Sequence, residues 1–434
     1  MYSDYMYRNI LIGMLTLILC SAVFLESPRV ISAQTNTVSK KIFAYYYVWW
    51  SNRHWHDKLG TSYPYTATPL PLPATIDSSE CTMTNLYSGN QLTDITNPTI
   101  WDQDVPGVIE TDVRNAVAAG LTGFLVSWKG NGSATQSVSD VSYSRRLDAM
   151  FQAVNKVNAE GHPFKLWISL KISDTIYPAE NIKGDLAYLK RQYGNNPALD
   201  MSFGKPVVVW TGSRKYDLAT IASVSTAFRS SFFLLADENY RTWNLDARPQ
   251  YFDGSTYYWS TQDPYGNPAS FDQIRQMAAK VRSTRNPDGS NKVWIAPFTP
   301  GYNDKLLNSP GTCIPRGNGQ TMNDLFNGNA TSNPEAWTFI SWNEIAEGSY
   351  ILPMTRYGRQ YIDLMATLTG GPAAITTQGD ANGDAIVDGR DYIIWALNVG
   401  TNTSSGVSVG DFDRSGVVND SDYQIWIREY TNSL

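Results

Sequence analysis

Two carboxylates three residues apart, Glu344 and Glu347, are the residues of this chain whose type and spacing best fit a chemical reaction. They follow an apolar, β-favouring run over 337–342 and precede Gly348. On a continuing strand, side chains at i and i+3 point to opposite faces, but a turn after Glu344 would bring Glu347 back to the same side. Glycoside hydrolysis uses such a pair: one carboxyl protonates the leaving oxygen and the other acts across the reacting carbon. For the spacing alone, an acidic pair on a solvated loop is the alternative.

The composition allows one large core or two domains, and it excludes partners that need a basic surface. Of 434 residues, 42% are hydrophobic and 13% aromatic, and the 14 Trp and 26 Tyr fit sugar stacking as well as an aromatic-rich core. From Gly379 onward nine acidic and three basic residues account for the whole net charge of −6. The rest of the chain is neutral, so there is no positive field for nucleic acid or for an anionic membrane.

The N-terminus has the features of a secretory signal peptide. Arg8 precedes an apolar run over 10–25, and 31–33 offers a cleavage site, so we assign 1–33 to the signal and predict a secreted, extracellular protein. No second hydrophobic segment follows, and we expect no membrane span in the mature form. After cleavage Cys81 and Cys313 remain. An oxidising compartment would allow them to pair, but the sequence leaves open whether they are close.

Between residues 40 and 368, strand-like apolar runs alternate with helical patterns in the order typical of a (β/α)8 TIM barrel. The predicted strands are 42–50, 123–129, 164–172, 205–210, 232–237, 255–259, 292–298 and 337–342. The predicted helices are 106–119, 145–160, 181–193, 218–229, 271–281, 321–326 and 357–368, with no clear helix in the connection 239–250. A doubly wound sheet is the rival fold. It would need a Gly-rich phosphate loop after its first strand, and the chain has Trp49-Trp50-Ser51-Asn52-Arg53 there.

Such a barrel carries its functional residues at the carboxyl ends of its strands. Polar and aromatic side chains are frequent at these predicted ends, among them Tyr47, Trp128, Tyr258 and Tyr302. Asp237-Glu238, at the end of the fifth strand, fits either a substrate-binding pair or members of a buried salt bridge. The insertion over 51–98 would lie above the first strand, as a lid or as a plain surface loop.

Beyond a linker over 369–378, an internal repeat defines a second domain, 379–434. Oxygen-bearing residues at alternate positions recur with an offset of 31 residues, in a pattern that suits a hard cation such as Ca²⁺. The first set is Asp380, Asn382, Asp384, the Ile386 carbonyl, Asp388 and Asp391. The second set is Asp411, Asp413, Ser415, the Val417 carbonyl, Asn419 and Asp422. A solvated acidic tail without metal is the alternative.

The duplicated half-EF-hand, with Asp391 and Asp422 as closing ligands and one helical pattern after each loop, resembles a type I dockerin. The resemblance implies a small α-helical, EF-hand-like domain that binds structural Ca²⁺ through the two sets of ligands. It also implies a cohesin-bearing scaffold protein as the partner.

The body of the chain, 40–368, resembles glycoside hydrolase family 99 and its wider set of related proteins, through short motifs that occur in the same order. The motifs are AYYYVWW (44–50), HWH (54–56), DVPGVIE (104–110), GFLVSW (123–128), FDG (252–254), YWST (258–261), PGYND (300–304), RGNG (316–319) and NEIAEGS (343–349). The resemblance implies a barrel that acts as a retaining α-glycosidase, often inside an α-mannan chain, without a catalytic cofactor.

In that family the first glutamate of the last motif acts on the sugar's own 2-hydroxyl and gives an anhydro-sugar intermediate. The resemblance therefore assigns Glu344 as that base and Glu347 as the acid/base at the glycosidic oxygen. The substrate-binding residues that we predict are Tyr47, Trp49, His54, Trp128, Tyr258, Tyr302, Asn343 and Tyr350. A plain surface role is the interpretation for His56, and a turn-forming role for Asp253.

The chain departs from the family's mannosidases between the two glutamates, where Ile345-Ala346 replaces Trp-His. This weakens the assignment to mannose, and an α-glucan remains an open substrate. Two further hypotheses stand beside hydrolysis: a non-catalytic glycan-binding barrel with the same rim, and an enzyme of polysaccharide assembly. The export signal and the dockerin pattern argue against the second of these.

Overall fold

The computed structural model describes residues 41–51, 54, 81, 101–131, 141–171, 176–305, 307–308, 310–354, 357–370, 379–381, 387–403, 406–413 and 415–432. The predicted signal peptide, most of the predicted linker and His56 lie outside the described residues. So do three predicted ligands of the first loop, Asn382, Asp384 and Ile386. The chain divides into two units, Met1–Val38 and Ser39–Leu434, and the described residues all belong to the second.

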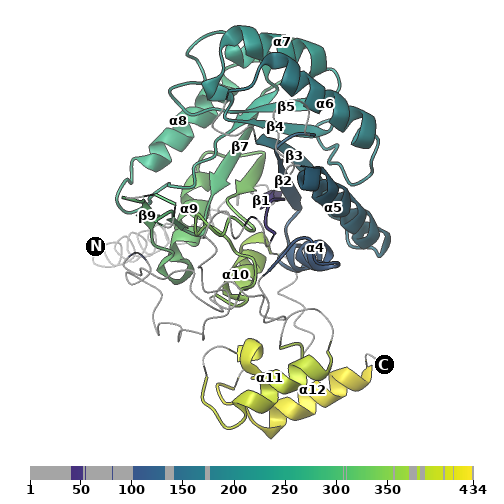
Figure 1. Ribbon diagram of the computed structural model, residues 1–434. Coiled ribbons are helices and arrows are strands. Elements are labelled where there is room, and N and C mark those ends of the chain that lie inside the picture. The colour runs from purple at the N-terminus through teal and green to yellow at the C-terminus, as the bar shows by residue number, and fades with distance from the viewer. Residues whose placement is uncertain are drawn as a thin grey trace, which may run out of the picture. The chain divides into compact units, whose positions relative to one another are not determined.

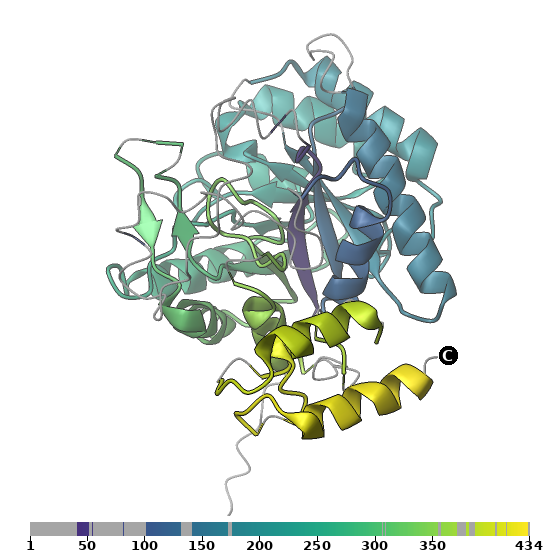
Figure 2. The same ribbon diagram turned by 60° about the horizontal axis from the view of Figure 1, so that its bottom comes forward.

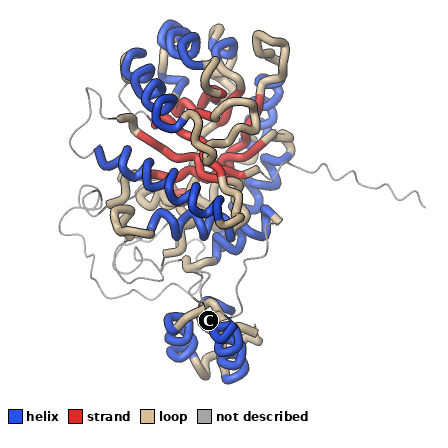
Figure 3. Tube along the Cα trace, turned by 90° about the vertical axis from the view of Figure 1, so that its right-hand side faces the viewer, coloured by secondary structure: helices blue, strands red, loops and turns tan. Residues whose placement is uncertain are grey.

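Within the described residues, eight parallel strands close into a barrel in the order β1-β10-β7-β6-β5-β4-β3-β2 (Figures 1 and 3). The strands are β1 (Ile42–Tyr47), β2 (Gly123–Trp128), β3 (Lys165–Lys171), β4 (Val207–Thr211), β5 (Phe233–Asp237), β6 (Gly254–Thr256), β7 (Val293–Phe298) and β10 (Ala336–Phe339). The first and last strands pair with each other, which closes the barrel. The predicted barrel is confirmed.

Helices surround the strands, as the tube in Figure 3 shows in blue around red. They are α4 (Val108–Ala118), α5 (Val141–Ala159), α6 (Ala179–Tyr193), α7 (Leu218–Phe228), α8 (Ser270–Arg282), α9 (Gln320–Ala330) and α10 (Gln360–Thr369). Short 3-10 turns are η3 (Ser213–Lys215), η4 (Arg248–Tyr251) and η5 (Gly317–Gly319), and β8 (Tyr302–Asn303) pairs with β9 (Cys313–Ile314) in an antiparallel hairpin. As the sequence predicts, the connection from β5 to β6, which the structure describes throughout, holds no α-helix.

The alternation of strand side chains separates the barrel interior from the helix layer. On β1, the Tyr46 hydroxyl donates to Asp112 of α4 at 2.7 Å, so this ring faces the helices. The neighbouring Tyr45 faces the interior, where its ring centroid lies 5.0 Å from that of Tyr258. Small hydroxyl side chains also lie in this interior, and those of Thr256 and Thr338 are 3.0 Å apart. The inside of the barrel is therefore polar as well as aromatic.

Three strands end three residues earlier than the sequence predicts. β1 ends at Tyr47 rather than residue 50, β6 at Thr256 rather than 259, and β10 at Phe339 rather than 342. The chain beyond two of these ends is held by side chains instead of strand partners: the Tyr47 N–H donates to Asn343 Oδ1 at 2.7 Å and the Tyr258 N–H to Asp237 Oδ1 at 2.9 Å. Regular strand pairing therefore stops at the carboxyl-terminal mouth of the barrel.

Cys81 and Cys313 form a disulfide with an S–S distance of 2.06 Å. The bond answers the question that the sequence leaves open, and it fastens a residue of the long insertion to β9. Among the helices of the described residues, none has the length and apolar character that a membrane crossing requires.

The C-terminal domain contains α11 (Gly389–Asn398), η6 (Gly406–Val409) and α12 (Asp420–Asn432), and Figures 1 and 2 show α11 and α12 side by side in yellow. Its apolar core consists of Ala381, Val387, Trp395, Val407, Phe412, Val418 and Trp426. The two repeats interlock. Trp395 Nε1 donates to the Asn419 carbonyl and Trp426 Nε1 to the Asp388 carbonyl, each at 3.0 Å, so each repeat's indole binds the other repeat's loop.

Candidate active site

A tight turn after β10 carries both glutamates. The Trp342 N–H still donates to the Tyr45 carbonyl at 2.8 Å, but the Ser341 N–H donates to the Ser349 carbonyl at 2.8 Å and so closes the turn. Inside it, the Glu344 N–H donates to Ser341 Oγ at 2.8 Å. Gly348 has φ 61, and a Cβ there would lie 3.1 Å from Asn303, so the return of the chain requires glycine.

The turn places the Glu347 carboxylate against two tyrosines of the barrel. The Tyr258 hydroxyl donates to Glu347 Oε2 at 3.2 Å, and the Tyr47 and Tyr258 hydroxyls are 2.7 Å apart. Because a phenol has a single proton, a Tyr258 that donates to Glu347 must accept from Tyr47. Glu344 is 5% exposed, whereas Glu347 is half-buried. One carboxylate therefore lies deeper in the barrel mouth than the other.

Both carboxylates act electrostatically on the same group of tyrosines. Burial raises the pKa of Tyr47 well above its usual value, and the charges of Glu344 and Glu347 raise it further. Burial also raises the pKa of Tyr258 and of Tyr302, followed in each case by the charge of Glu347 and, more weakly, by that of Glu344. The three phenols stay protonated as hydrogen-bond donors, and the two glutamates share one environment. Both glutamates of the turn therefore lie near enough to these phenols to act on their pKa values.

Asn343 positions the first tyrosine. Its amide binds the main chain of Tyr47 from both ends, with Nδ2 donating to the carbonyl at 2.9 Å and Oδ1 accepting from the N–H at 2.7 Å. Gln103, which sequence reasoning did not single out, donates to the same carbonyl at 2.8 Å and accepts from the Trp50 N–H at 2.8 Å. Asn343, which the sequence predicts to bind substrate, therefore holds the main chain of Tyr47 in place.

Trp49 and His54 extend the aromatic wall from Tyr47. The Trp49 ring centroid lies 4.5 Å from that of Tyr47 and 6.3 Å from that of His54. Lys129 Nζ lies over the Trp49 ring, 4.6 Å from its centroid, in cation–π geometry. These residues, together with Tyr47 and Tyr258, form a wall of the kind that stacks on sugar rings.

Three other predicted residues take different positions. Trp128 is fully buried on the outer side of β2, where its Nε1 donates to Ser144 of α5 at 3.3 Å and its ring stacks on Tyr188 of α6. The sequence places Trp128 at a strand end but does not say which way it faces. Tyr350 is buried against Arg316, whose guanidinium lies 5.2 Å from the ring centroid. Tyr302 is 8% exposed, and its hydroxyl donates to Asp304 at 3.2 Å.

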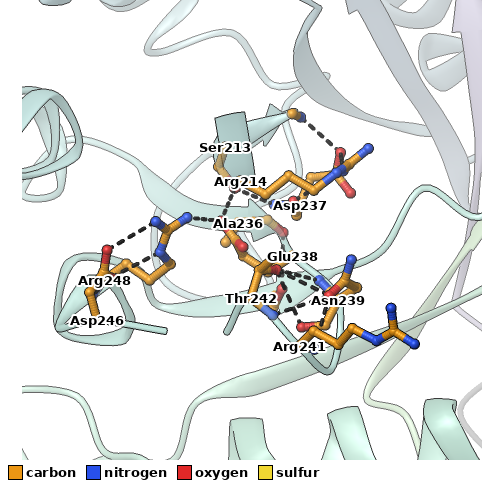
Figure 4. Close-up of polar contacts among 12 residues, drawn as sticks. Ser213, Arg214, Ala236, Asp237, Glu238, Asn239, Arg241, Thr242, Asp246 and Arg248 are labelled. Carbon is orange, nitrogen blue, oxygen red and sulfur yellow. Dashed lines mark hydrogen bonds and ion pairs between the residues drawn. The ribbon is translucent and has the colours of Figure 1, made fainter. Parts of the chain in front are cut away.

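Two ion pairs with buried carboxylates lie at the end of β5 (Figure 4). Asp237 accepts from Arg214 Nη1 at 2.8 Å, and Glu238 accepts from Arg248 Nη1 at 3.1 Å. Burial raises the pKa of Glu238, which also accepts from Ser213 Oγ at 2.8 Å. Of the two interpretations of Asp237-Glu238, the buried salt bridge is the one that the structure shows. The sequence shows only an acidic pair at the end of an apolar run, which does not identify Arg214 and Arg248 as the partners.

The second loop of the C-terminal domain gathers three carboxylates. Oxygen atoms of Asp411, Asp413 and Asp422 lie within 4.8 Å of one another. Asp422 is fully buried and accepts from the N–H groups of Asp413 at 3.0 Å and Asn419 at 2.8 Å. Carboxylate oxygens at this spacing are the donor set that Ca²⁺ takes. In the first loop, the described Asp388 and Asp391 form a capping box at the start of α11.

The geometry defines a (β/α)8 barrel whose mouth holds two glutamates and an aromatic wall. No protein-family model and no curated protein matches the chain. Among solved structures, it is similar to the GH99 endo-α-mannosidase from Bacteroides thetaiotaomicron, with a TM-score of 0.52 and 18% identity over 74% of this chain and 89% of that one. A second structure, of a GH99 endo-α-mannosidase from the same organism in complex with bis-tris-propane, gives a TM-score of 0.53 and 16% identity over 77% and 98%. At these identities the likeness establishes a shared fold.

Proposed function

We propose that this chain is a secreted, retaining, endo-acting α-glycosidase that hydrolyses an α-mannan or a related α-linked polysaccharide. The observation that carries the proposal is the connection of the two glutamates through the tyrosines. Tyr258 donates to Glu347 and contacts Tyr47, and both carboxylates raise the pKa values of these two phenols. Two carboxyl groups that share one aromatic-walled mouth meet the basic requirement of glycoside hydrolysis.

Each glutamate has a separate role in this proposal. Glu347 protonates the glycosidic oxygen as the bond to the anomeric carbon breaks, and Glu344 takes the proton of the sugar's 2-hydroxyl as that oxygen attacks the anomeric carbon. Water then opens the anhydro-sugar at the anomeric carbon and gives its proton to Glu347, while Glu344 returns its proton to the 2-oxygen. Two displacements at one carbon retain its configuration. The half-buried Glu347 suits contact with a leaving sugar, and the deeper Glu344 suits contact with the sugar in the mouth.

The residues between the glutamates bear on the choice of sugar. Ile345 is fully buried and Ala346 is 3% exposed, so this part of the turn offers apolar packing where the mannosidases of family 99 carry Trp-His. Neither side chain hydrogen-bonds a hydroxyl. Mannose and glucose differ in the configuration of the 2-hydroxyl. In an α-mannoside this hydroxyl is trans to the leaving oxygen and can attack the anomeric carbon, whereas in an α-glucoside it is cis and cannot. Both α-mannans and α-1,3-glucans therefore belong in the test, and cleavage of the glucan would contradict the anhydro-sugar route.

The test is release of new reducing ends by the mature chain from these polysaccharides, beside Glu344→Gln and Glu347→Gln. Each substitution should lower turnover by about 100-fold or more, since general acid–base groups contribute on this scale. Glu335→Gln is the matched control, because Glu335 lies at the opposite end of β10 and accepts from the Trp294 N–H at 2.9 Å. Unchanged turnover in both site variants would refute the site. Binding of glycan without new reducing ends would favour the non-catalytic barrel.

Residues 379–434 act in the same proposal as a dockerin that tethers the barrel to a cohesin-bearing scaffold. The carboxylates of Asp411, Asp413 and Asp422, with Ser415, the Val417 carbonyl and Asn419, would hold one Ca²⁺, and the first loop would hold another. The bound ion supplies the positive charge that offsets these clustered carboxylates. The reciprocal contacts of Trp395 and Trp426 support a module in which both loops depend on each other.

A further inference from the structure

Asp237, the last residue of β5, is connected through Tyr258 to Glu347 of the candidate site. It is 1% exposed and uses both carboxylate oxygens. Oδ2 accepts from Arg214 Nη1 and from the Gly212 N–H, each at 2.8 Å, and Oδ1 accepts from the Tyr258 N–H at 2.9 Å (Figure 4 shows the pair with Arg214). The first two contacts fix the carboxylate to residues 212–214, which follow β4, so its position does not depend on Tyr258 alone.

Tyr258 is the residue that Asp237 holds. It lies two residues beyond the last residue of β6, where strand pairing has ended, and its N–H has Asp237 as its acceptor. Its hydroxyl donates to Glu347 Oε2 at 3.2 Å. A chain of contacts thus runs from the carboxylate of Asp237, through the main chain and ring of Tyr258, to the carboxylate of Glu347.

We propose that Asp237 is a positioning residue for the protonation step: it fixes the main chain of Tyr258, and the Tyr258 hydroxyl in turn orients Glu347 toward the leaving oxygen. The inference rests on the proposed function, because it assigns the acid role to Glu347. Asp237 itself does not touch the sugar. Its loss should therefore impair the first, bond-breaking step only where the leaving group needs a proton, and kcat/KM reports that step.

Substitution by asparagine tests this with little change in size. An asparagine at 237 keeps one oxygen acceptor, but its amide nitrogen is a donor and cannot accept from the Gly212 N–H, from Arg214 or from the Tyr258 N–H. At least one of the three contacts is lost in either orientation of the amide. Asp237→Ala, which removes the acceptors without adding a donor, is the second variant if the asparagine variant does not fold.

Substrates with different leaving groups distinguish a role of Asp237 in positioning the acid from a general structural role. When an α-linked polysaccharide is cleaved, the departing sugar leaves as an alcohol and needs a proton. When a glycosyl fluoride is cleaved, the departing group is fluoride, which needs none. We compare kcat/KM for α-mannan and α-1,3-glucan with kcat/KM for the matching α-mannobiosyl and α-1,3-glucobiosyl fluorides. Asp237→Asn should lower the ratio of polysaccharide to fluoride activity by about 10–100-fold, the scale that misplacement of a catalytic group produces.

Asp253→Asn is the matched control. Asp253 is buried beside an arginine at the other end of the barrel, accepting from Arg229 Nε and from the Leu234 N–H, each at 2.8 Å. Its substitution also breaks a buried ion pair, and it should lower the unfolding temperature while leaving the activity ratio unchanged. An equal loss on polysaccharide and fluoride in Asp237→Asn, or the same change of ratio in Asp253→Asn, would overturn the inference.

Crystal structures of the wild type and of Asp237→Ala, which cannot accept from the Tyr258 N–H at all, decide the same question without turnover. We expect the contact between the Tyr258 hydroxyl and Glu347 to be broken in the variant, and its retention would overturn the inference. If the wild type cleaves neither polysaccharide nor fluoride, the proposed function fails, and these two structures still decide whether Asp237 positions Tyr258.

Discussion

Replacement of Tyr258 by phenylalanine removes a hydroxyl through which the barrel holds Glu347. That oxygen donates to Glu347 at 3.2 Å and contacts the Tyr47 hydroxyl at 2.7 Å. A hydrogen bond to a charged group contributes about 1.5–3 kcal/mol, but 3.2 Å is long for an O–H···O bond, so we take the lower value. If the contact is fully formed in the transition state, about 1.5 kcal/mol corresponds to a loss of about tenfold in kcat/KM.

The assay is release of reducing ends from the cleaved polysaccharide, with thermal unfolding of each variant measured in parallel. Tyr46→Phe is the matched control. Its hydroxyl also donates to a buried carboxylate, that of Asp112 at 2.7 Å, but on the helix side of β1. Both variants should lose stability, and only Tyr258→Phe should lose activity. A folded Tyr258→Phe protein with wild-type kcat/KM, or an equal loss in Tyr46→Phe, would refute the reasoning.

Three further predictions concern parts of the chain outside the reacting groups. Burial raises the pKa of Asp185 to about 6, so the folded state favours its neutral form and the contribution of this group to stability falls as pH rises from about 4 through 6. Asp185→Asn should therefore gain on the order of 2 kcal/mol of unfolding free energy relative to wild type between pH 4 and pH 7. A constant difference across that range would contradict this. Addition of Ca²⁺ to chelated protein should raise the unfolding temperature of residues 379–434, and Asp422→Asn should reduce the rise, because only the first loop would still bind the ion. Calorimetry that gives the same rise in both proteins would exclude the second loop as a Ca²⁺ site. Replacement of Cys81 and Cys313 by alanine should cost about 2–5 kcal/mol of unfolding free energy, because the bond closes a loop of 232 residues, and denaturant curves that coincide with wild type would count against it.

The barrel was predictable from the sequence because its strands are apolar runs and its helices have apolar residues that recur at the helical period. Both signals are local, and they place the strands on the chain even where only three residues, Gly254–Thr256, pair as a strand. The ends of the strands are different. Past Tyr47 and Thr256 the backbone is held by side chains from distant segments, such as Asn343 and Asp237, and a distant partner leaves no local pattern.

The two carboxylates of the candidate site were predictable from the sequence, but the side chains around them were only partly so. Glu344 and Glu347 could be named because the turn that unites them is encoded within nine residues, 341–349. Trp128 could not be placed, because a shift of one position along β2 decides whether a ring faces the barrel interior or the helices. The partner of Asp237 could not be named either, since Arg214 lies on another strand–helix connection.

The pairing of β1 with β10 makes the candidate site the last part of the barrel that can form during synthesis. Tyr47 is among the first barrel residues to leave the ribosome, but its main chain is held by Asn343, and the Trp342 N–H binds the Tyr45 carbonyl. A nascent chain or a fragment that lacks residues after 335 would leave β1 and β7 as open edges and would carry neither glutamate. The two glutamates can therefore join the tyrosines of β1 and of the β6 end only once all eight strands have been made.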